Sequence, residues 1–149
     1  MMFSTKAEYG VRVMAHLAAC DDDRPVALSA IAEAEGLPPA YLEHLVARLR
    51  RADLVDSRRG AHGGYTLARP AGTISMAEVV AALEGDIASV DCISADPDGE
   101  LICSRERASS APCPTKLLWT RVQASIVHTL EEMTLADLVR QPEPKRVPV

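Results

Sequence analysis

Apolar residues recur at helical spacing along most of the chain and predict a mainly α-helical protein. In the first part, the periodicity and the capping residues indicate helices over about residues 4–20, 29–35, 39–52 and 75–83. The third of these carries an apolar stripe at i, i+3, i+4 and i+7, formed by Leu42, Leu45, Val46 and Leu49. Its other side is polar and basic. This helix is therefore expected to bury one side and to offer the other to a partner.

The second and third helices have the arrangement of a helix-turn-helix motif. Gly36 is expected to end the second helix, Leu37 and Pro38 to form the turn, and Pro39 to open the third helix. A short helix, a tight turn and a longer helix with a basic outer face is typical of a motif that reads the major groove. Taken alone, the pair could also be a plain helical hairpin with a solvated charged face.

The sequence up to residue 67 predicts a β-hairpin. Its strands contain the apolar residues 54–55 and residues 65–67, and the turn between them is basic and rich in glycine. Glycines allow positive φ and close approach, and paired guanidinium groups suit phosphates or a narrow minor groove. After a helix-turn-helix, such a hairpin is typical of the wing of a winged-helix DNA-binding domain. The residues expected to contact duplex DNA are Ser29, Pro39, Ala40, Tyr41, Glu43, His44, Arg48, Arg51, Arg58, Arg59, Gly60, His62, Gly63, Gly64 and Tyr65.

The charge distribution supports this interpretation better than the total does. The net charge of −5 argues weakly against nucleic acid. However, the span 48–69 holds the arginines 48, 50, 51, 58, 59 and 69 against only Asp53 and Asp56. Acidic residues predominate instead in the span 84–106, which also carries cysteines. For binding to phosphate backbones, the distribution of charge matters more than its sum.

Other features exclude several classes of protein. No apolar run approaches the roughly 20 residues needed to cross a membrane. The first helix carries Lys6, Glu8 and Arg12, so it is not expected to be a signal peptide, and a cytoplasmic location is expected. We find no phosphate-binding loop, nucleophile elbow or acid–base pair, so the chain is not expected to be an enzyme.

Three cysteines lie in residues 86–114, a stretch with little periodicity. Cys92, Cys103 and Cys113 have the spacing C-x10-C-x9-C, which does not match the close pairs of structural zinc sites. Three thiolates suit a soft metal centre such as an iron–sulfur cluster. The spacing equally permits a disulfide switch or three ordinary loop cysteines. Cys20, on the first helix, is expected to be a small buried hydrophobe.

A long helix is predicted over about residues 115–133. Its apolar stripe has no obvious partner of equal length within the chain, so we expect it to pair with its twin in a homodimer. Packing across its own domain is the alternative. The expected interface residues are Leu118, Val122, Ile126 and Leu130. The predicted organisation is a winged helix-turn-helix domain (1–85), a cysteine-bearing loop (86–114), a dimerisation helix with a C-terminal segment (115–140) and a flexible tail (141–149).

Several of these motifs resemble the winged-helix regulators typified by the iron–sulfur cluster regulator IscR and the nitric-oxide sensor NsrR. The matching stretches are residues 2–10, 39–43, 59–67, 118–119 and 134–138. The resemblance implies a homodimeric transcription factor, and many members of the family hold an iron–sulfur cluster through three cysteines before the dimerisation helix. Cys92, Cys103 and Cys113 occupy that position.

The chain departs from the IscR-type pattern at the fourth ligand. In that branch a histidine follows the last cysteine by three residues, whereas Lys116 stands here, and a protonated lysine is an improbable ligand. The resemblance to the nitric-oxide-sensing branch implies instead a carboxylate on the first helix, which is Glu8. The alternative role of Glu8 is a capping box with Thr5.

The sequence thus predicts a repressor that binds a pseudo-palindromic operator in duplex DNA. The resemblance implies that its affinity is controlled by a [2Fe–2S] or [4Fe–4S] cluster. A cluster-free regulator that responds to thiol chemistry or a metabolite is the first alternative. An iron–sulfur electron-transfer or scaffold protein is the second.

Overall fold

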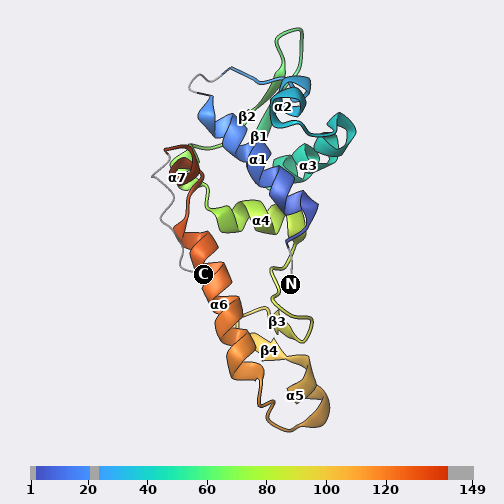
Figure 1. Cartoon of the computed structure of the whole chain (residues 1–149), viewed down its shortest axis with the longest axis vertical. Coiled ribbons are helices and arrows are strands. Elements are labelled where there is room, and N and C mark those ends of the chain that lie inside the picture. The colour runs from blue at the N-terminus through green and yellow to red at the C-terminus, as the bar shows by residue number, and fades with distance from the viewer. Residues whose placement is uncertain (1–2, 21–23, 141–149) are drawn as a thin grey trace.

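The computed structural model describes residues 3–20 and 24–140, and it divides into a head and an arm (Figure 1). The head contains α1 to α4, the β1–β2 hairpin and α7, and the arm contains β3, β4, α5 and most of α6. The elements are α1 (Thr5–Ala19), α2 (Leu28–Glu35), α3 (Pro39–Arg51), β1 (Val55–Arg58), β2 (Gly64–Leu67), the 3-10 helix η1 (Ala71–Thr73), α4 (Met76–Glu84), β3 (Ile93–Ala95), β4 (Leu101–Cys103), α5 (Ser104–Ser109), α6 (Lys116–Glu132) and α7 (Leu135–Val139). The predicted winged helix-turn-helix fold is confirmed.

The core of the head forms where α1 packs between α3, α4 and α7. All four residues of the predicted α3 stripe, Leu42, Leu45, Val46 and Leu49, are buried there. Gly36 ends α2 at φ 63° and ψ 38°, the left-handed conformation that glycine adopts without strain. Pro39 opens α3 as predicted, and Ser75 begins α4 in a capping box with Glu78. These local signals therefore determine where α2 ends and where α3 and α4 begin.

The wing is an antiparallel hairpin in which Val55 pairs with Leu67 and Arg58 with Gly64. An isolated antiparallel β-bridge at Val26, which the sequence did not predict, lies along it. The N–H of Val26 donates to the carbonyl of Tyr65, and the N–H of Tyr65 donates to the carbonyl of Val26, both at 2.9 Å. The start of α2 is thereby fixed to the base of the wing.

Gly64 is where the close approach of the Val26 backbone requires glycine. A Cβ atom at that position would lie 2.4 Å from the carbonyl oxygen of Val26, a backbone atom that cannot move aside easily. We expect Gly64→Ala to lower the free energy of unfolding by about 2 kcal/mol or more. Urea unfolding measures the effect. Gly72→Ala is the control, because its Cβ atom would meet only Ala136 at 3.9 Å. Equal stability of the two variants would contradict the prediction.

The segment 86–114, which was expected to be a loop, contains regular secondary structure. Its strands β3 and β4 pair antiparallel, with Ile93 opposite Cys103, and α5 follows directly. Asp96 stabilises the hairpin loop, because its carboxylate accepts hydrogen bonds from the N–H groups of Asp98 and Glu100, each at 2.9 Å. Strands of three residues are too short to show alternation, so periodicity could not reveal them.

The arm is anchored to the head at the C-terminal end of α6. After α6, the N–H of Leu135 donates to the carbonyl of Ile74 at 2.9 Å, and α7 packs on α1. At the other end, Leu117 and Leu118 are 64% and 55% exposed. Of the predicted interface stripe, Leu118 is exposed and Val122 and Ile126 are half-buried, but Leu130 packs partly on the core of the head. The predicted tail, 141–149, lies outside the described residues.

Candidate DNA-binding surface and cysteine site

The exposed side of α3 and the wing form one continuous surface. A hollow of about 180 Å³ separates them, lined by Glu43, Val46, Ala47, Arg50, Arg51 and Tyr65. Arg50, which the sequence did not single out as a contact residue, donates from Nη1 to the hydroxyl of Ser57 at 3.1 Å. This bond ties α3 to β1, and so fixes the distance between the helix and the wing.

The first turn of α3 is open at its N-terminus. Pro38 precedes it and no side chain caps it, while Pro39 and Ala40 are exposed. Such an uncapped turn favours a negatively charged partner. His44 is exposed beside it, and Ser29 is exposed on α2.

Two of the residues predicted to contact DNA have intramolecular partners. The ring of Tyr41 meets that of Tyr9 edge to face, with centroids 5.8 Å apart, so it is held against α1. Arg48 donates from Nη1 to the carbonyl of Leu83 at 3.3 Å, on the side of α4. These contacts orient α3 within the head, and they leave the hollow side of the helix to Glu43, Ala47 and Arg51.

The tip of the wing is basic and projects from the head (Figure 1). Arg58, Arg59, Gly60 and His62 are exposed, and within residues 3–20 and 24–140 no hydrogen bond or ion pair engages either guanidinium group. A Cβ atom at Gly63 would lie 2.3 Å from the carbonyl oxygen of Arg58, so the tight turn requires glycine there. The turn thus presents two free cations on a fixed backbone.

The hairpin of the arm brings the three predicted cysteine ligands toward one place. Cys103 ends β4, is 1% exposed, and pairs with the residue that follows Cys92. The carbonyl of Cys92 accepts from the N–H of Ser104 at 2.9 Å. Cys113 is near enough to Cys103 for that thiol to influence its pKa, and its own N–H donates to Glu106 at 3.0 Å. Three residues separated by up to 21 positions therefore share the far part of the arm.

The surroundings of Cys113 favour its thiolate. Hydrogen bonds from Thr115, and a weaker one from Cys103, lower the pKa of the Cys113 thiol. Lys116 lies beside this group, and its Nζ is 2.7 Å from Glu106. This ion pair, followed by the nearby thiols, raises the pKa of Lys116. Lys116 is thus held as a cation, which makes it unsuitable as a ligand.

Glu8 lies apart from the cysteines, in the first turn of α1 within the head. Ser4, not Thr5, is the N-cap of that helix, so the capping box of Thr5 with Glu8 is not formed. Glu8 is exposed and no side-chain partner holds it among the described residues. Across the same residues, no three histidine, cysteine, aspartate or glutamate side chains are close enough to bind one metal ion.

Ser4 connects this end of α1 to the end of α4. The carboxylate of Glu84 accepts from the N–H of Ser4 at 2.9 Å and from the Ser4 hydroxyl. The hydroxyl is the main cause that lowers the pKa of Glu84 below its ordinary value of 4.5. A lowered carboxyl pKa stabilises the folded state above the unfolded pKa, and this contribution is lost as the pH falls through the folded pKa.

We expect Ser4→Ala to lower the free energy of unfolding by about 1 kcal/mol at neutral pH. The difference from the wild type should shrink at acidic pH, because protonation of Glu84 weakens the same bond in the wild type. Urea unfolding near pH 7 and about pH 3.5, at one protein concentration, checks this. In a Glu84→Gln background the effect of Ser4→Ala should show no such shrinkage. A gap that stays constant with pH when Glu84 is present would contradict the prediction.

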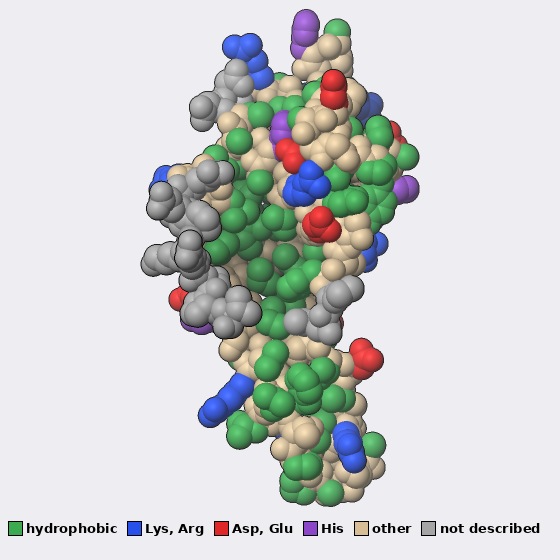
Figure 2. Space-filling model, viewed as in Figure 1, with side chains coloured by type: hydrophobic (Ala, Val, Ile, Leu, Met, Phe, Trp, Pro, Cys, Tyr) green, Lys and Arg blue, Asp and Glu red, His purple; other side chains and the backbone are tan. Residues whose placement is uncertain are grey.

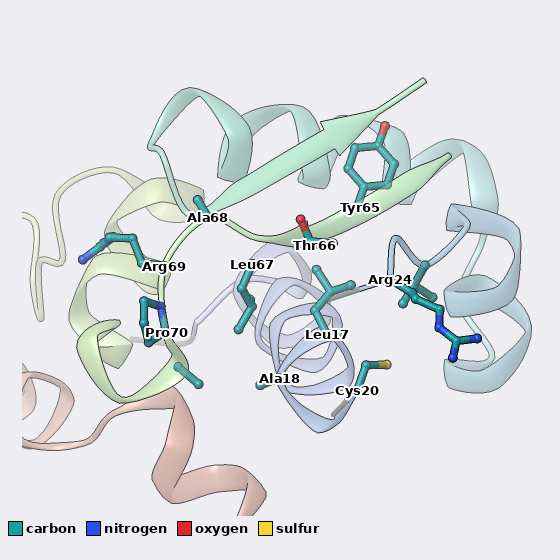
Figure 3. Close-up of a pocket in the computed structure, with 12 residues that line it drawn as sticks. Leu17, Ala18, Cys20, Arg24, Tyr65, Thr66, Leu67, Ala68, Arg69 and Pro70 are labelled. Carbon is teal, nitrogen blue, oxygen red and sulfur yellow. The ribbon is translucent and has the colours of Figure 1, made fainter. Parts of the chain in front are cut away.

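Cys20 has a different environment from the other three cysteines. It is half-buried rather than buried, and its thiol donates to the carbonyl of His16 at 3.4 Å. With Leu17 and Ala18 it lines a hollow of about 450 Å³ between the end of α1 and β2 (Figure 3). The expectation of a fully buried Cys20 was therefore wrong. Its position in the head excludes it from the cysteine site of the arm.

The amino-acid sequence matches a known protein family over nearly its whole length. The family model described as "Rrf2: Iron-dependent Transcriptional regulator" matches residues 3–141. The chain belongs to the Rrf2 family. It is therefore a transcriptional regulator of a DNA-binding, non-enzymatic family, and the predicted resemblance is confirmed.

Individual relatives differ in what they are named for. Protein rrf2 of Nitratidesulfovibrio vulgaris is 36% identical over 140 residues, which cover 94% of this chain and 88% of that protein. The structure of CymR, described as the global cysteine regulator of B. subtilis, has a TM-score of 0.73 at 33% identity and covers 96% of this chain and 99% of that chain. The structure of T. potens IscR has a TM-score of 0.74 at 37% identity and covers 100% and 93%. Membership in the Rrf2 family thus shows that the chain is a transcriptional regulator, but it does not identify the signal to which the regulator responds.

The surface of the arm fits the dimeric state that is typical of the family. On the face shown in Figure 2, apolar side chains are spread over the arm with few charged ones between them. An apolar surface on a protein of this kind indicates a protein partner.

No helix in the described part of the chain is both long and apolar enough to cross a membrane.

Proposed function

We propose that this chain is a homodimeric repressor whose affinity for a pseudo-palindromic operator is controlled by an iron–sulfur cluster. The observation that carries the proposal is the convergence of Cys92, Cys103 and Cys113 on one part of the arm. A cluster holds its cysteines farther apart than a single ion does. The absence of a ready site for one ion among the described residues is therefore compatible with a cluster.

The residues available as ligands are of the kind that binds an iron–sulfur cluster. Three cysteines supply thiolate ligands, the environment of Cys113 favours its deprotonated form, and the Lys116 ammonium group offsets negative charge nearby. For the fourth position we propose Glu8 of the partner subunit, because Glu8 is exposed and unengaged within the described part of its own chain. When bound, the cluster would supply a centre that iron scarcity, oxidation or nitric oxide can remove.

On the DNA side, we propose that α3 enters the major groove with Glu43 and Arg51 facing the bases and phosphates. The wing would place Arg58 and Arg59 at the adjacent minor groove. Glu43 can accept from cytosine N4 and repels nearby phosphates, so it would disfavour wrong sequences. Because the arm carries both the cysteines and the proposed dimer contacts, its order would set the spacing of the two recognition helices.

One experiment tests the proposal directly. Protein purified without oxygen is examined by absorption spectroscopy and by counting iron and sulfide, and operator binding is measured before and after the cluster is removed. Brown protein whose operator affinity changes on removal supports the proposal. Colourless protein that stays iron-free after attempted reconstitution contradicts it.

The influence of the Cys103 thiol on the pKa of Cys113 favours a second function, that of a cluster-free thiol switch. The two thiols would form a disulfide and release two protons and two electrons to an oxidant such as hydrogen peroxide, which is reduced to two waters. Operator binding would then be independent of iron and would change on oxidation. A Cys103–Cys113 cross-link, detected by mass spectrometry, would distinguish this function from the first.

A further inference from the structure

Gln123, in the middle of α6, is one of two buried polar side chains among the described residues. It is 5% exposed, although most of the neighbouring side chains on α6 are open to solvent. A buried amide is costly unless its donor and its acceptor are both satisfied. Its position therefore requires specific partners.

Both ends of this amide bind the backbone of one distant segment. The Oε1 atom accepts from the N–H of Ser89 at 2.5 Å, and the Nε2 group donates to the carbonyl of Ile87. The two partners flank Ala88, and they precede Gln123 by 34 and 36 residues. The side chain thus acts on this segment as a neighbouring strand would.

The segment that Gln123 holds leads directly to the first cysteine. It begins after Gly85, which ends α4 at φ 83°, and it reaches Cys92 three residues after Ser89. Downstream, the chain is fixed by the bond from Ser104 to the carbonyl of Cys92 and by the pairing of β3 with β4. Upstream, Gln123 supplies the hydrogen bonds that tie the same backbone to α6.

Ser89 is held in place through its backbone N–H and not through its side chain. Its hydroxyl is buried and has no hydrogen-bond partner among the described residues, whereas its N–H is bound by Gln123. An unsatisfied hydroxyl destabilises the folded state, so the side chain of Ser89 does not hold the segment in place.

We propose that Gln123 is a positioning residue for the cysteine site: it fixes the position of Cys92 relative to Cys103 and Cys113, and couples that position to α6. The inference rests on the proposed function for its biological meaning. The positioning itself is a property of the chain and can be tested without iron.

The test uses the full-length, reduced and iron-free protein. In Gln123→Leu, which keeps the volume and removes both bonds, we expect hydrogen exchange across residues 86–91 and alkylation of Cys92 by iodoacetamide to rise about tenfold. Alkylation of Cys20, in the head, is the internal standard and should not change. In Gln123→Glu, which keeps the acceptor for Ser89 but loses the donor to Ile87, we expect a smaller rise.

Two variants serve as controls. Ser89→Ala removes the unpartnered hydroxyl, and Ser125→Ala alters an exposed neighbour on α6, so neither should raise the alkylation of Cys92. A selective rise at Cys92 in the Gln123 variants supports the inference. An unchanged rate, or an equal rise at Cys20, would overturn it. A selective rise in a protein that never binds iron would uphold the positioning role and reject the proposed cluster.

Discussion

Cys92→Ala and Cys113→Ala are each expected to abolish cluster binding while leaving a folded dimer. Both side chains are half-buried in the arm, outside the core of the head, so truncation creates no large cavity. Iron and sulfide content should fall to background in either variant. Operator binding should no longer differ between protein prepared with and without iron. The measurements are metal analysis, the visible spectrum and a binding titration on operator DNA.

Cys20→Ala is the matched control for these variants. It removes one thiol of similar exposure from the head, where the described structure holds it away from the other three. Its iron content and its regulated binding should equal those of the wild type. Normal cluster content in Cys92→Ala or in Cys113→Ala would reject the ligand assignment.

The same variants separate the two proposed functions. If the protein is a thiol switch formed by Cys103 and Cys113, Cys113→Ala should lose its response to oxidant and Cys92→Ala should keep it. If it holds a cluster, the two variants should behave alike. Cys103→Ala is less informative, since that side chain is 1% exposed and its loss also disturbs the packing of β4.

Local sequence signals were sufficient for the helix-turn-helix and for α4 in the head. The α3 stripe, the stop at Gly36 and the cap at Ser75 each act within a few residues, so their outcome could be predicted from sequence. The wing was predictable for the same reason, because turn chemistry is local. The β3–β4 hairpin also carried a turn signal, Pro97-Asp98-Gly99, but strands of three residues offered no alternation to support it.

Contacts between distant residues account for the rest. The sequence marked Tyr41 and Arg48 as DNA contacts on α3, but only their partners, Tyr9 and Leu83, show which way the side chains turn. Likewise, the amide of Gln123 finds its partners 34 and 36 residues away. No periodicity or spacing records such pairs, so the orientation of site residues had to come from the structure.

The double variant Arg58→Ala, Arg59→Ala is expected to weaken operator binding about 100-fold to 1000-fold at physiological salt. The two guanidinium groups are exposed at the wing, and within the described residues they have no other partner. A dimer would lose four cations from its DNA-binding face. If all four contact phosphates, the salt dependence should weaken by up to about four units in the slope of log K against log salt, at roughly 0.9 per contact.

The control must remove the same charge from elsewhere. Arg107 and Arg140 are exposed and lie outside α3 and the wing, so their double replacement with alanine matches the change in net charge. That variant should bind the operator within a few-fold of the wild type. Equal losses in the two double variants would show that the wing acts only through net charge.

Replacement with lysine distinguishes the two roles open to the wing arginines. Lysine keeps the charge but lacks the planar fork, so Arg58→Lys, Arg59→Lys should restore the salt slope if the contacts are simple phosphate contacts. If the arginines instead read a narrow minor groove, the slope should recover while the preference for operator over random duplex stays reduced. Titrations on both duplexes at several salt concentrations decide between them. Wild-type affinity in the alanine double variant would reject the wing as a DNA contact.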